Sequence, residues 1–599
     1  MGDLLIDIEC DGFLKEATRV HCIAFKEPGT GKVLSVGGPT DHKIRELLPH
    51  LEEADTLIGH NLIEFDIPVL QKIYPNFKPR GKRWDTLLDV QSMFTDMRNL
   101  DFNLRRKNND FPAEMIGKHS LKAWGIRLGY LKGNFGETTD WAAWSQAMQD
   151  YCERDIVVNE KILDMIRKSV RFCQVAHDTE MEFKEYTLDQ EREGFPLDQD
   201  KTKALYTELA AERASLEAVL AGSFEPWEVS TDFVPKRDNK TKGYVAGVAF
   251  KKTKLVSFNP RSHKHIADRL IQIYGWQPEE FTEAGAPCTD SDVLAALVTK
   301  IPVCKPLARH AEIQKIIGMI AEGKSAYLKK VDADGRIRGR IGTCTTVTAR
   351  CNHYEPNLGN VPRRSELGHK VRELFYAPPG YKLVGIDAKG VQLRLMAHYL
   401  ARYDGGAYAK VVVEGDPHLF HQTLMGLPTK DMAKTVFYAW LFGGGDKKLG
   451  NTINKGMAAG RALKLKFFAR FPALNQLKNA VGFKAKMQGW LSGIDGRRLT
   501  IRSEHSALCS LLQSAEAIVM KRALIYLNRA LRASGAYQRG EVRQAIFVHD
   551  EVQLLTKEGH EDYAARLAID SIREAGRSFN LRVALDAEAK VGRTWDETH

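Results

Sequence analysis

Acidic residues near the amino end of the chain have the spacing of metal ligands. Asp7 and Glu9 come at the end of a short apolar stretch that predicts a β-strand. Residues two apart on a strand project from the same face, so both carboxylates can reach one cation. Hard divalent cations such as Mg²⁺ prefer such oxygen ligands. The pair therefore predicts part of a metal site, whereas a lone Asp-x-Glu would more often be a surface pair.

Two later segments carry further acids. Asp66 stands directly before a helical pattern, where it could also serve as a helix cap. Tyr151 and Asp155 are four residues apart and share one face of a predicted helix, which is also a common surface arrangement. Acids from these separate elements can together hold two cations about 4 Å apart, with water as the attacking nucleophile.

A second acidic pair lies in the C-terminal half. An apolar segment from 381 to 386 predicts a strand that stops at Asp387, and a helical pattern follows. Asp550 lies in a His549-Asp550-Glu551 turn between two apolar segments, as in a β-hairpin. Singly, Asp387 could cap a helix and Asp550 could stabilise the turn. Jointly, charges at the end of an apolar sheet are costly unless coordinated or paired, and this favours a metal site.

Between these acids, one helical segment carries two cations and an aromatic ring. Thr429 can cap the helix, and Lys430, Lys434 and Tyr438 then fall at positions i, i+4 and i+8. They form a stripe about 12 Å long, which suits a triphosphate with a sugar and base at its far end. The alternative is a solvated lysine face with one exposed tyrosine.

The N-terminal acids resemble the three-motif pattern of the DnaQ-like 3′→5′ exonucleases. The resemblance covers roughly residues 1–165 and implies an RNase H-like domain. It implies that Tyr151 orients the attacking water and that four acids bind metal: Asp7, Glu9, Asp66 and Asp155.

The C-terminal segments resemble motifs A, B and C of family A DNA polymerases. The matching segments are Asp387–Gly390, Lys430–Tyr438 and Val548–Glu551, supported by Thr348–Arg350 and Leu511–Ala515. With the exonuclease half, the resemblance covers nearly the whole chain and is closest to the replicative polymerases of T-seven-like podophages. It implies a right-hand polymerase with palm, fingers and thumb, which follows the exonuclease domain and replicates phage DNA.

The resemblance assigns roles by position. Asp387 and Asp550 would hold two Mg²⁺ ions with the Ala388 carbonyl, beside Glu551 as a further catalytic residue. Two more Mg²⁺ ions would occupy the exonuclease site, and Mn²⁺ suits the same ligands. The dNTP would contact His418, Lys430, Lys434, Tyr438 and Gln392. DNA would contact Arg350, Gln513 and His549, the first two through minor-groove acceptors that all correct base pairs share.

Three positions bear on substrate choice. Gln392 stands five residues after Asp387, where the family usually has a Glu that blocks a ribose 2′-hydroxyl. We expect deoxyribose selection to persist in weakened form. Lys430 replaces the usual Arg, so a point charge stands where a bidentate fork would bind. In the family, a Tyr at the position of Tyr438 accompanies acceptance of dideoxynucleotides, so we expect ready chain termination.

Composition agrees with a large nucleic-acid enzyme. The 599 residues predict two to four domains, and the net charge of +11 with a pI near 9.0 suits a polyanionic partner. Between residues 446 and 486 there are ten Lys or Arg and a single acid, Asp446, which favours phosphate contact. No apolar run has the ~20 residues that a membrane span needs.

The expected architecture combines α/β and α+β domains. We expect an exonuclease domain at 1–175, a thumb at 176–330 with a basic loop or β-rich insertion near 224–257, palm segments at 331–400 and 509–599, and fingers at 401–508. The resemblance implies primer-template DNA, dNTPs, a phage helicase-primase and a single-strand binding protein as partners, in the cytoplasm of an infected bacterial host. In the T-seven type, a long thumb insertion binds host thioredoxin, which acts as a processivity clamp. The matching insertion here is about half as long, so thioredoxin binding stays open.

Three other functions fit parts of the sequence. One is a 3′→5′ exonuclease whose C-terminal half only binds DNA. Another is a sugar-tolerant polymerase or reverse transcriptase, which Gln392 alone suggests. A third is a non-catalytic scaffold at the replication fork, which leaves two complete carboxylate sets without a purpose.

Overall fold

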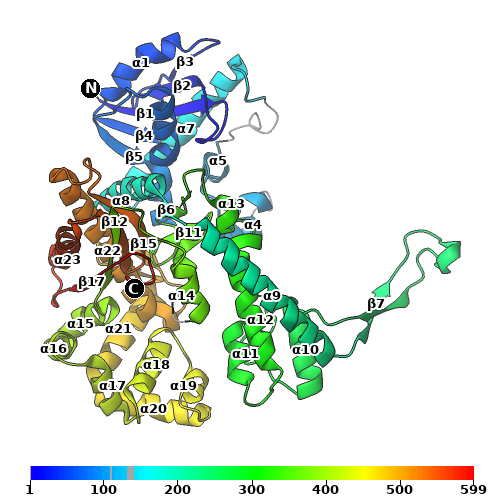
Figure 1. Ribbon diagram of the computed structural model, residues 1–599. Coiled ribbons are helices and arrows are strands. Elements are labelled where there is room, and N and C mark those ends of the chain that lie inside the picture. Colours follow the sequence, from blue (N-terminus) through cyan, green and yellow to red (C-terminus); the bar gives the residue numbers. More distant parts are fainter. Residues whose placement is uncertain (1, 108–110, 131–139, 283, 364) are drawn as a thin grey trace.

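The computed structural model describes residues 2–599 except 108–110, 131–139, 283 and 364. An N-terminal α/β domain stands on a larger C-terminal part that divides into two helical arms, with a β-hairpin projecting from one arm (Figure 1). Within the described part of the chain, no helix has the length and apolar character that crossing a membrane requires.

The N-terminal domain is built on a five-stranded sheet in the order β3-β2-β1-β4-β5. β1 pairs antiparallel with β2 and parallel with β4, so it lies at the centre. The strands are β1 (Asp3–Cys10), β2 (Val20–Lys26), β3 (Leu34–Gly37), β4 (Thr56–Gly59) and β5 (Lys82–Asp85). The helices are α1 (His42–Glu52), the π-helical turn η1 (Leu62–Asp66), α2 (Ile67–Ile73), α3 (Thr86–Met93), α4 (Met97–Lys107), α5 (Leu121–Leu128) and α7 (Gln146–Lys168).

Long helices lead from this domain into the first arm. α8 (Gln174–Glu193) ends at Gly194, whose φ of 68° suits glycine, and the Asp198 carboxylate accepts the Lys201 N–H at 2.9 Å to begin α9 (Gln199–Ser223). The other elements are β6 (Phe195–Pro196), α10 (His263–Tyr274), α11 (Ser291–Leu297), α12 (Cys304–Ile317) and α13 (Tyr327–Lys330).

The segment expected to form a loop or β-rich insertion is a two-stranded hairpin. β7 (Trp227–Phe233) pairs antiparallel with β8 (Phe250–Val256), and nearly every residue of both strands is exposed. The hairpin extends away from the arm (Figure 1). An isolated two-stranded ribbon buries little apolar surface, so its stability benefits from a partner on one face.

A four-stranded antiparallel sheet, in the order β15-β16-β12-β17, forms the base of the C-terminal part. Its strands are β12 (Tyr381–Ala388), β15 (Val542–Val548), β16 (Glu551–Lys557) and β17 (Ala587–Gly592). The helices beside it are α14 (Glu366–Arg372), α15 (Val391–Asp404), α22 (Ala507–Ala533) and α23 (Glu561–Ser578). Apolar residues of the sheet and of α15, α22 and α23 belong to one continuous core.

The chain between α15 and α22 forms the second arm, which is mostly helical. Its elements are α16 (Ala407–Glu414), α17 (Pro417–Met425), α18 (Lys430–Leu441), α19 (Asp446–Thr452), α20 (Met457–Arg470), α21 (Pro472–Gln488), β13 (Trp490–Ser492) and β14 (Arg498–Thr500). The short strands β9 (Arg336–Ile337), β10 (Arg340–Gly342) and β11 (Asn352–Tyr354) lie nearer the N-terminal domain.

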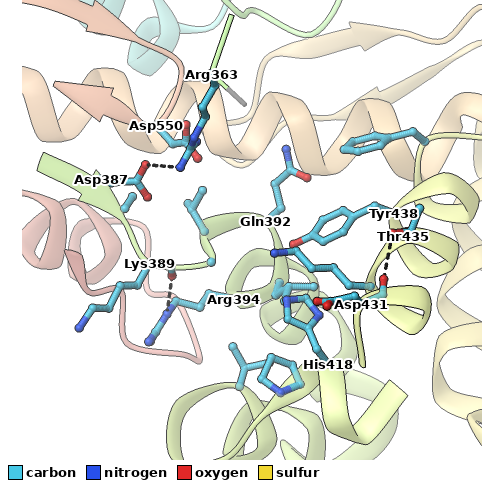
Figure 2. A pocket seen from close by; sticks show the side chains of 18 residues that line it. Arg363, Asp387, Lys389, Gln392, Arg394, His418, Asp431, Thr435, Tyr438 and Asp550 are labelled. Carbon is cyan, nitrogen blue, oxygen red and sulfur yellow. Dashed lines mark hydrogen bonds and ion pairs between the residues drawn. The ribbon is translucent and has the colours of Figure 1, made fainter. Parts of the chain in front are cut away.

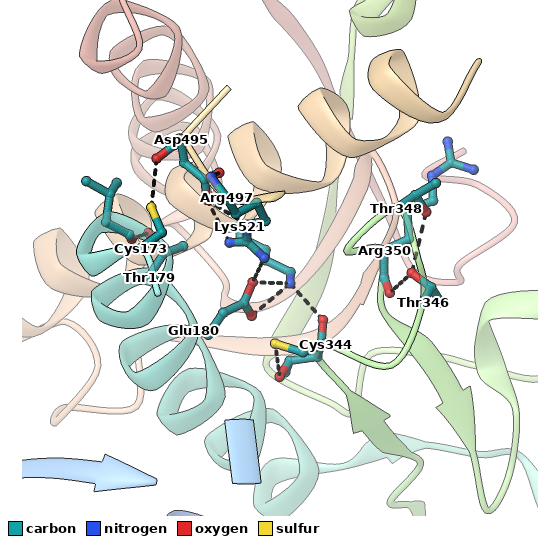
Figure 3. Close-up of polar contacts among 12 residues, drawn as sticks. Cys173, Thr179, Glu180, Cys344, Thr346, Thr348, Arg350, Asp495, Arg497 and Lys521 are labelled. Carbon is teal, nitrogen blue, oxygen red and sulfur yellow. Dashed lines mark hydrogen bonds and ion pairs between the residues drawn. The ribbon is translucent and has the colours of Figure 1, made fainter. Parts of the chain in front are cut away.

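A buried ion network joins α8 to α22 (Figure 3). Glu180 accepts hydrogen bonds from Lys521 and Arg497, each at 2.7 Å, and all three side chains are almost fully buried. Lys521 also donates to the Thr343 carbonyl at 2.7 Å. Burial opposes ionisation of Glu180, but the charges of Lys521 and Arg497 outweigh it and lower the pKa of Glu180. One carboxylate of α8 therefore holds two cations that lie 317 and 341 positions later in the chain.

Replacing Glu180 by Ala would leave two buried cations without their shared carboxylate. We expect the variant to lose about 3–5 kcal/mol of stability, seen as a lower midpoint of thermal unfolding. Glu574→Ala is the control, because the Glu574–Arg577 pair is solvent-exposed and worth about 0–1 kcal/mol. Equal midpoints for the two variants would contradict the assigned role of Glu180.

Candidate active sites

A cavity of about 1140 Å³ opens where β12 ends (Figure 2). Its walls come from β12, α15, α17, α18 and the turn between β15 and β16. Site residues predicted from the sequence that line it are Asp387, Ala388, Gln392, His418, Lys434, Tyr438 and Asp550. The structure therefore brings segments more than 150 residues apart in the chain into one pocket.

Asp387 and Asp550 lie on one side of this pocket. β12 pairs with β16 so that Asp387 is opposite Glu551, and the Ala388 N–H donates to the Asp550 carbonyl at 3.1 Å. His549 adopts a φ of 56°, which tightens the turn before Asp550. Burial, followed by the negative charge of Asp550, raises the pKa of Asp387 to about 6.

This arrangement fits a divalent cation. Two carboxylates that share a partly buried space repel each other, and a cation between them removes both the repulsion and the cost of burial. The nearest cationic side chain on Asp387 is Arg363, at 3.6 Å and half-exposed. Carboxylate oxygens with a backbone carbonyl at Ala388 are the ligand types that Mg²⁺ and Mn²⁺ accept.

The opposite wall is cationic and aromatic. Lys434 and Tyr438 of α18 line the cavity with His418 of α17, whose ring lies 6.1 Å from that of Tyr438. The Thr429 hydroxyl accepts the Met432 N–H and begins α18, which confirms the predicted cap. His418 and Tyr438 lie across the pocket from Asp387 and Asp550 (Figure 2).

Lys430 is placed differently from its two companions on α18. Its ammonium group pairs with Asp416 at 2.9 Å, and both side chains are more than one-third exposed. Lys430 is not among the residues that line the cavity, whereas Asp431 and Thr435, which sequence reasoning missed, do line it. The expected stripe is therefore real as a helix face, but in this structure only two of its three members reach the pocket.

Behind the pocket, α22 carries an acid that sequence reasoning missed. Glu516 forms an ion pair with Arg350 and accepts hydrogen bonds from the Gln392 amide at 3.1 and 3.3 Å. Gln513 stands on the same helix, one turn before Glu516. A single acid within the apolar run from Ala515 to Met520 was the available sequence signal.

The N-terminal acids meet beside a cysteine. Oxygen atoms of Asp7 and Glu9 and the Cys152 sulfur lie within 4.8 Å of one another, and the Cys152 thiol donates to the Asp7 carbonyl at 3.3 Å. Asp66 is fully buried; burial, and then the charges of Asp85 and Asp155, raise its pKa to about 7.

Asp155 is buried on α7, and Tyr151 is half-buried one turn earlier on the same helix. The four predicted acids therefore lie on β1, η1 and α7 around one end of the sheet. Cys152 was not predicted to take part, and Asp85 caps α3 through the Leu87 N–H at 3.0 Å. Buried acids that raise one another's pKa fit a cation site, as in the C-terminal pocket.

Comparison with known proteins identifies the family. Residues 239–597 match the model of DNA polymerase family A. The chain belongs to DNA polymerase family A. It is 30% identical to the DNA-directed DNA polymerases of Enterobacteria phage T3 and Escherichia phage T7, over the full length of all three chains. It is therefore a DNA-directed DNA polymerase of the phage type.

A solved structure shows the same fold. The POL domain of Pol1 from M. smegmatis, in complex with DNA primer-template and dNTP, superimposes with a TM-score of 0.75. The superposition covers 99% of this chain and 96% of the M. smegmatis chain, at 18% sequence identity. The right-hand polymerase fold expected from the sequence is confirmed.

Glu551 of the polymerase was predicted to be catalytic, but its carboxylate is directed toward the C-terminal tail. It accepts hydrogen bonds from Trp595 at 2.5 Å and Gln553 at 2.8 Å, and its oxygen lies 2.9 Å from His599 Nδ1. Burial opposes ionisation, but His599 and then Arg372 lower the pKa of Glu551 to about 2. Its catalytic role stays a prediction, while its hold on the tail is structural.

The basic segment 446–486 of the polymerase is less one-sided in space than in sequence. Lys447 and Lys448 pair with Glu279 and Glu280 of the other arm at 3.2 and 2.8 Å. Lys464 pairs with Asp446. The sequence could not show the first two pairs, because their acids lie on the opposite arm. These two ion pairs join the ends of the two arms.

Glu551→Ala should loosen the tail, because Trp595 and His599 lose a buried acceptor. We expect amide hydrogens of residues 594–599 to exchange at least about tenfold faster, since a hydrogen bond to a charged group contributes about 1.5–3 kcal/mol. Glu558→Ala, which breaks only the exposed pair with Arg593, should leave exchange unchanged. Unchanged exchange in Glu551→Ala would contradict the anchoring role.

Proposed function

We propose that the polymerase extends a primer 3′ end along a DNA template, proofreads with a 3′→5′ exonuclease in its N-terminal domain, and replicates a phage genome. The observation that carries the proposal is the C-terminal pocket.

In the polymerase site, Asp387, Asp550 and the Ala388 carbonyl would hold two Mg²⁺ ions. When bound, these ions would activate the primer 3′-hydroxyl and neutralise charge on the triphosphate. Lys434 and His418 would bind the triphosphate, and the Tyr438 ring would pack near the incoming sugar. Lys430 could join them by leaving Asp416, because that pair is exposed and weak.

At the primer end, Arg350, Gln513 and His549 would contact DNA. Arg350 lies beside the pocket, where its guanidinium group could donate to the minor-groove acceptors that every correct base pair presents. A mispaired end would displace those acceptors, so the contact would favour extension of correct pairs.

In the N-terminal domain, Asp7, Glu9, Asp66 and Asp155 would hold two further Mg²⁺ ions, and Tyr151 would orient the attacking water. Support comes from the raised pKa of Asp66, because a buried acid of this kind ionises readily only beside a cation. Hydrolysis of a terminal phosphodiester would remove a misincorporated nucleotide.

The hairpin of β7 and β8 supplies a basic surface for duplex DNA. Residues 227–256 contain seven Lys or Arg against three acids. On one face Lys252 and Lys254 stand opposite Thr231 and Val229, and the acids Glu228 and Asp232 lie on the other face. This surface would contact phosphates directly, without a clamp protein such as thioredoxin. Phage helicase-primase and single-strand binding protein remain proposed partners.

A labelled primer on a DNA template tests both activities. With Mg²⁺ and all four dNTPs the primer should lengthen, and without dNTPs it should shorten. Asp550→Ala should abolish lengthening alone, and Asp7→Ala should abolish shortening alone, because each removes a metal ligand from one site only. Shortening under both conditions would favour an exonuclease whose C-terminal half only binds DNA.

Replacing Lys252 and Lys254, which share one face of the hairpin, by Gln tests this contact. If each lysine contacts one phosphate, the slope of log affinity against log salt should fall by about 0.9 per lost contact. The measurement is fluorescence anisotropy of duplex primer-template DNA at several salt concentrations. The matched control removes two exposed lysines of the N-terminal domain, Lys32 and Lys78. Equal slopes for the two double variants would refute direct contact.

A further inference from the structure

Glu516 is a buried acid for which the proposed reaction has no role. Its side chain is only 3% exposed, and most of α22 around it is apolar. A buried carboxylate is costly unless its oxygens are paired. Both oxygens are used here, since Glu516 binds Arg350 and the amide of Gln392, two residues already predicted to contact substrates.

The contact with Glu516 fixes how Gln392 faces the pocket. An ionised carboxylate can only accept hydrogen bonds, whereas the Gln amide has a donating NH₂ group and an accepting oxygen. The Gln392 NH₂ group therefore turns toward Glu516. The contact also restrains a long side chain that would otherwise sample several rotamers.

Gln392 lies in a sensitive place. It projects into the pocket between Asp550 and the Tyr438 ring (Figure 2). Family A enzymes usually carry a Glu at this position, where it blocks a ribose 2′-hydroxyl. In this chain the amide stands on α15 and the carboxylate on α22, in direct contact with each other. The negative charge near Tyr438 therefore stands on Glu516 of α22, behind the uncharged amide of Gln392.

We propose that Glu516 is a positioning residue for sugar selection, which holds Gln392 in the space beside Tyr438 that a 2′-hydroxyl would occupy. This inference rests on the proposed polymerase function, because it places the incoming sugar near Tyr438. Without Glu516, the Gln392 side chain can leave that space, and a ribonucleotide then meets less steric resistance.

The two contacts of Glu516 have separable effects. Arg350 would contact the primer end. Without its ion-pair partner Glu516, insertion of dNTPs and rNTPs would slow to the same extent. Gln392 lies near the sugar, so its release changes only the preference between them. The ratio of kcat/KM for a dNTP and its matching rNTP isolates the second effect, and a general loss of folding stability cancels from it.

Single-nucleotide insertion by wild type, Glu516→Ala, Gln392→Ala and the double variant tests the proposal. We expect Glu516→Ala to lower the dNTP/rNTP ratio about tenfold, the effect of losing one charged hydrogen bond. Gln392→Ala should lower it at least as much, and the double variant no further, because Glu516 acts through Gln392. An unchanged ratio in Glu516→Ala, or additive losses in the double variant, would overturn the proposal.

A charge exchange between the two positions provides an independent check. Gln392→Glu alone places two carboxylates in contact inside the protein and should impair sugar selection. Adding Glu516→Gln restores one carboxylate and one amide, and the ratio should recover. A ratio that did not recover would count against the contact between positions 392 and 516 as the cause of sugar selection.

Lys521→Met serves as the folding control, since Lys521 is buried on the same helix but lies in the Glu180 network. It should lower the midpoint of thermal unfolding without changing the dNTP/rNTP ratio. A changed ratio in this variant would overturn the specific role of Glu516. If the wild type inserted no dNTP at all, the proposed function would fall as well, whereas normal insertion with unmoved ratios would refute only the role of Glu516.

Discussion

Repulsion between Asp387 and Asp550 is the constraint around which the C-terminal half is organised. The two acids are brought together by the antiparallel register of β12 with β16 and by the left-handed conformation of His549. Burial in a shared space raises the pKa of Asp387 and makes the pair unfavourable without a cation. The continuous apolar core beneath the sheet holds the strands in a register that their charges oppose.

Helix α22 connects this pocket with the rest of the molecule. Glu516 reaches the pocket wall through Gln392 and pairs with Arg350, and farther along the helix Lys521 enters the buried network with Glu180. Because Glu180 belongs to α8, which follows the N-terminal domain, one rigid helix joins the two halves. Substrate selection, in our proposal, therefore depends on a residue that the substrate never touches.

The N-terminal domain also brings carboxylates together, but it uses different elements to do so. Asp66 and Asp155 come from η1 and α7, and β1 supplies Asp7 and Glu9. Burial and mutual repulsion again raise the pKa of one member, so a cation would stabilise the folded domain. Two unrelated sheets thus gather like charges at a strand end, where the backbone fixes side chains that would otherwise separate.

The sequence by itself determined what depends on neighbours along the chain. Period and capping residues predicted the strand that leads to Asp387 and the start of α18 at Thr429. The segment near 224–257 was predicted as a loop or β-rich insertion, and only the structure shows it to be a hairpin. Spacing also placed Asp7 beside Glu9, since the strand period is a local property. The family resemblance supplied the roles that spacing could not, and the comparisons confirmed the family.

Only the tertiary structure decided which distant groups share an interaction. Glu516 meets a residue 124 positions away at Gln392, and Lys448 meets one 168 positions away at Glu280. Glu551 likewise turns to a tail 44 positions away at Trp595. Such pairs leave no periodic trace in the chain, because they depend on how whole elements pack rather than on the spacing of residues within them.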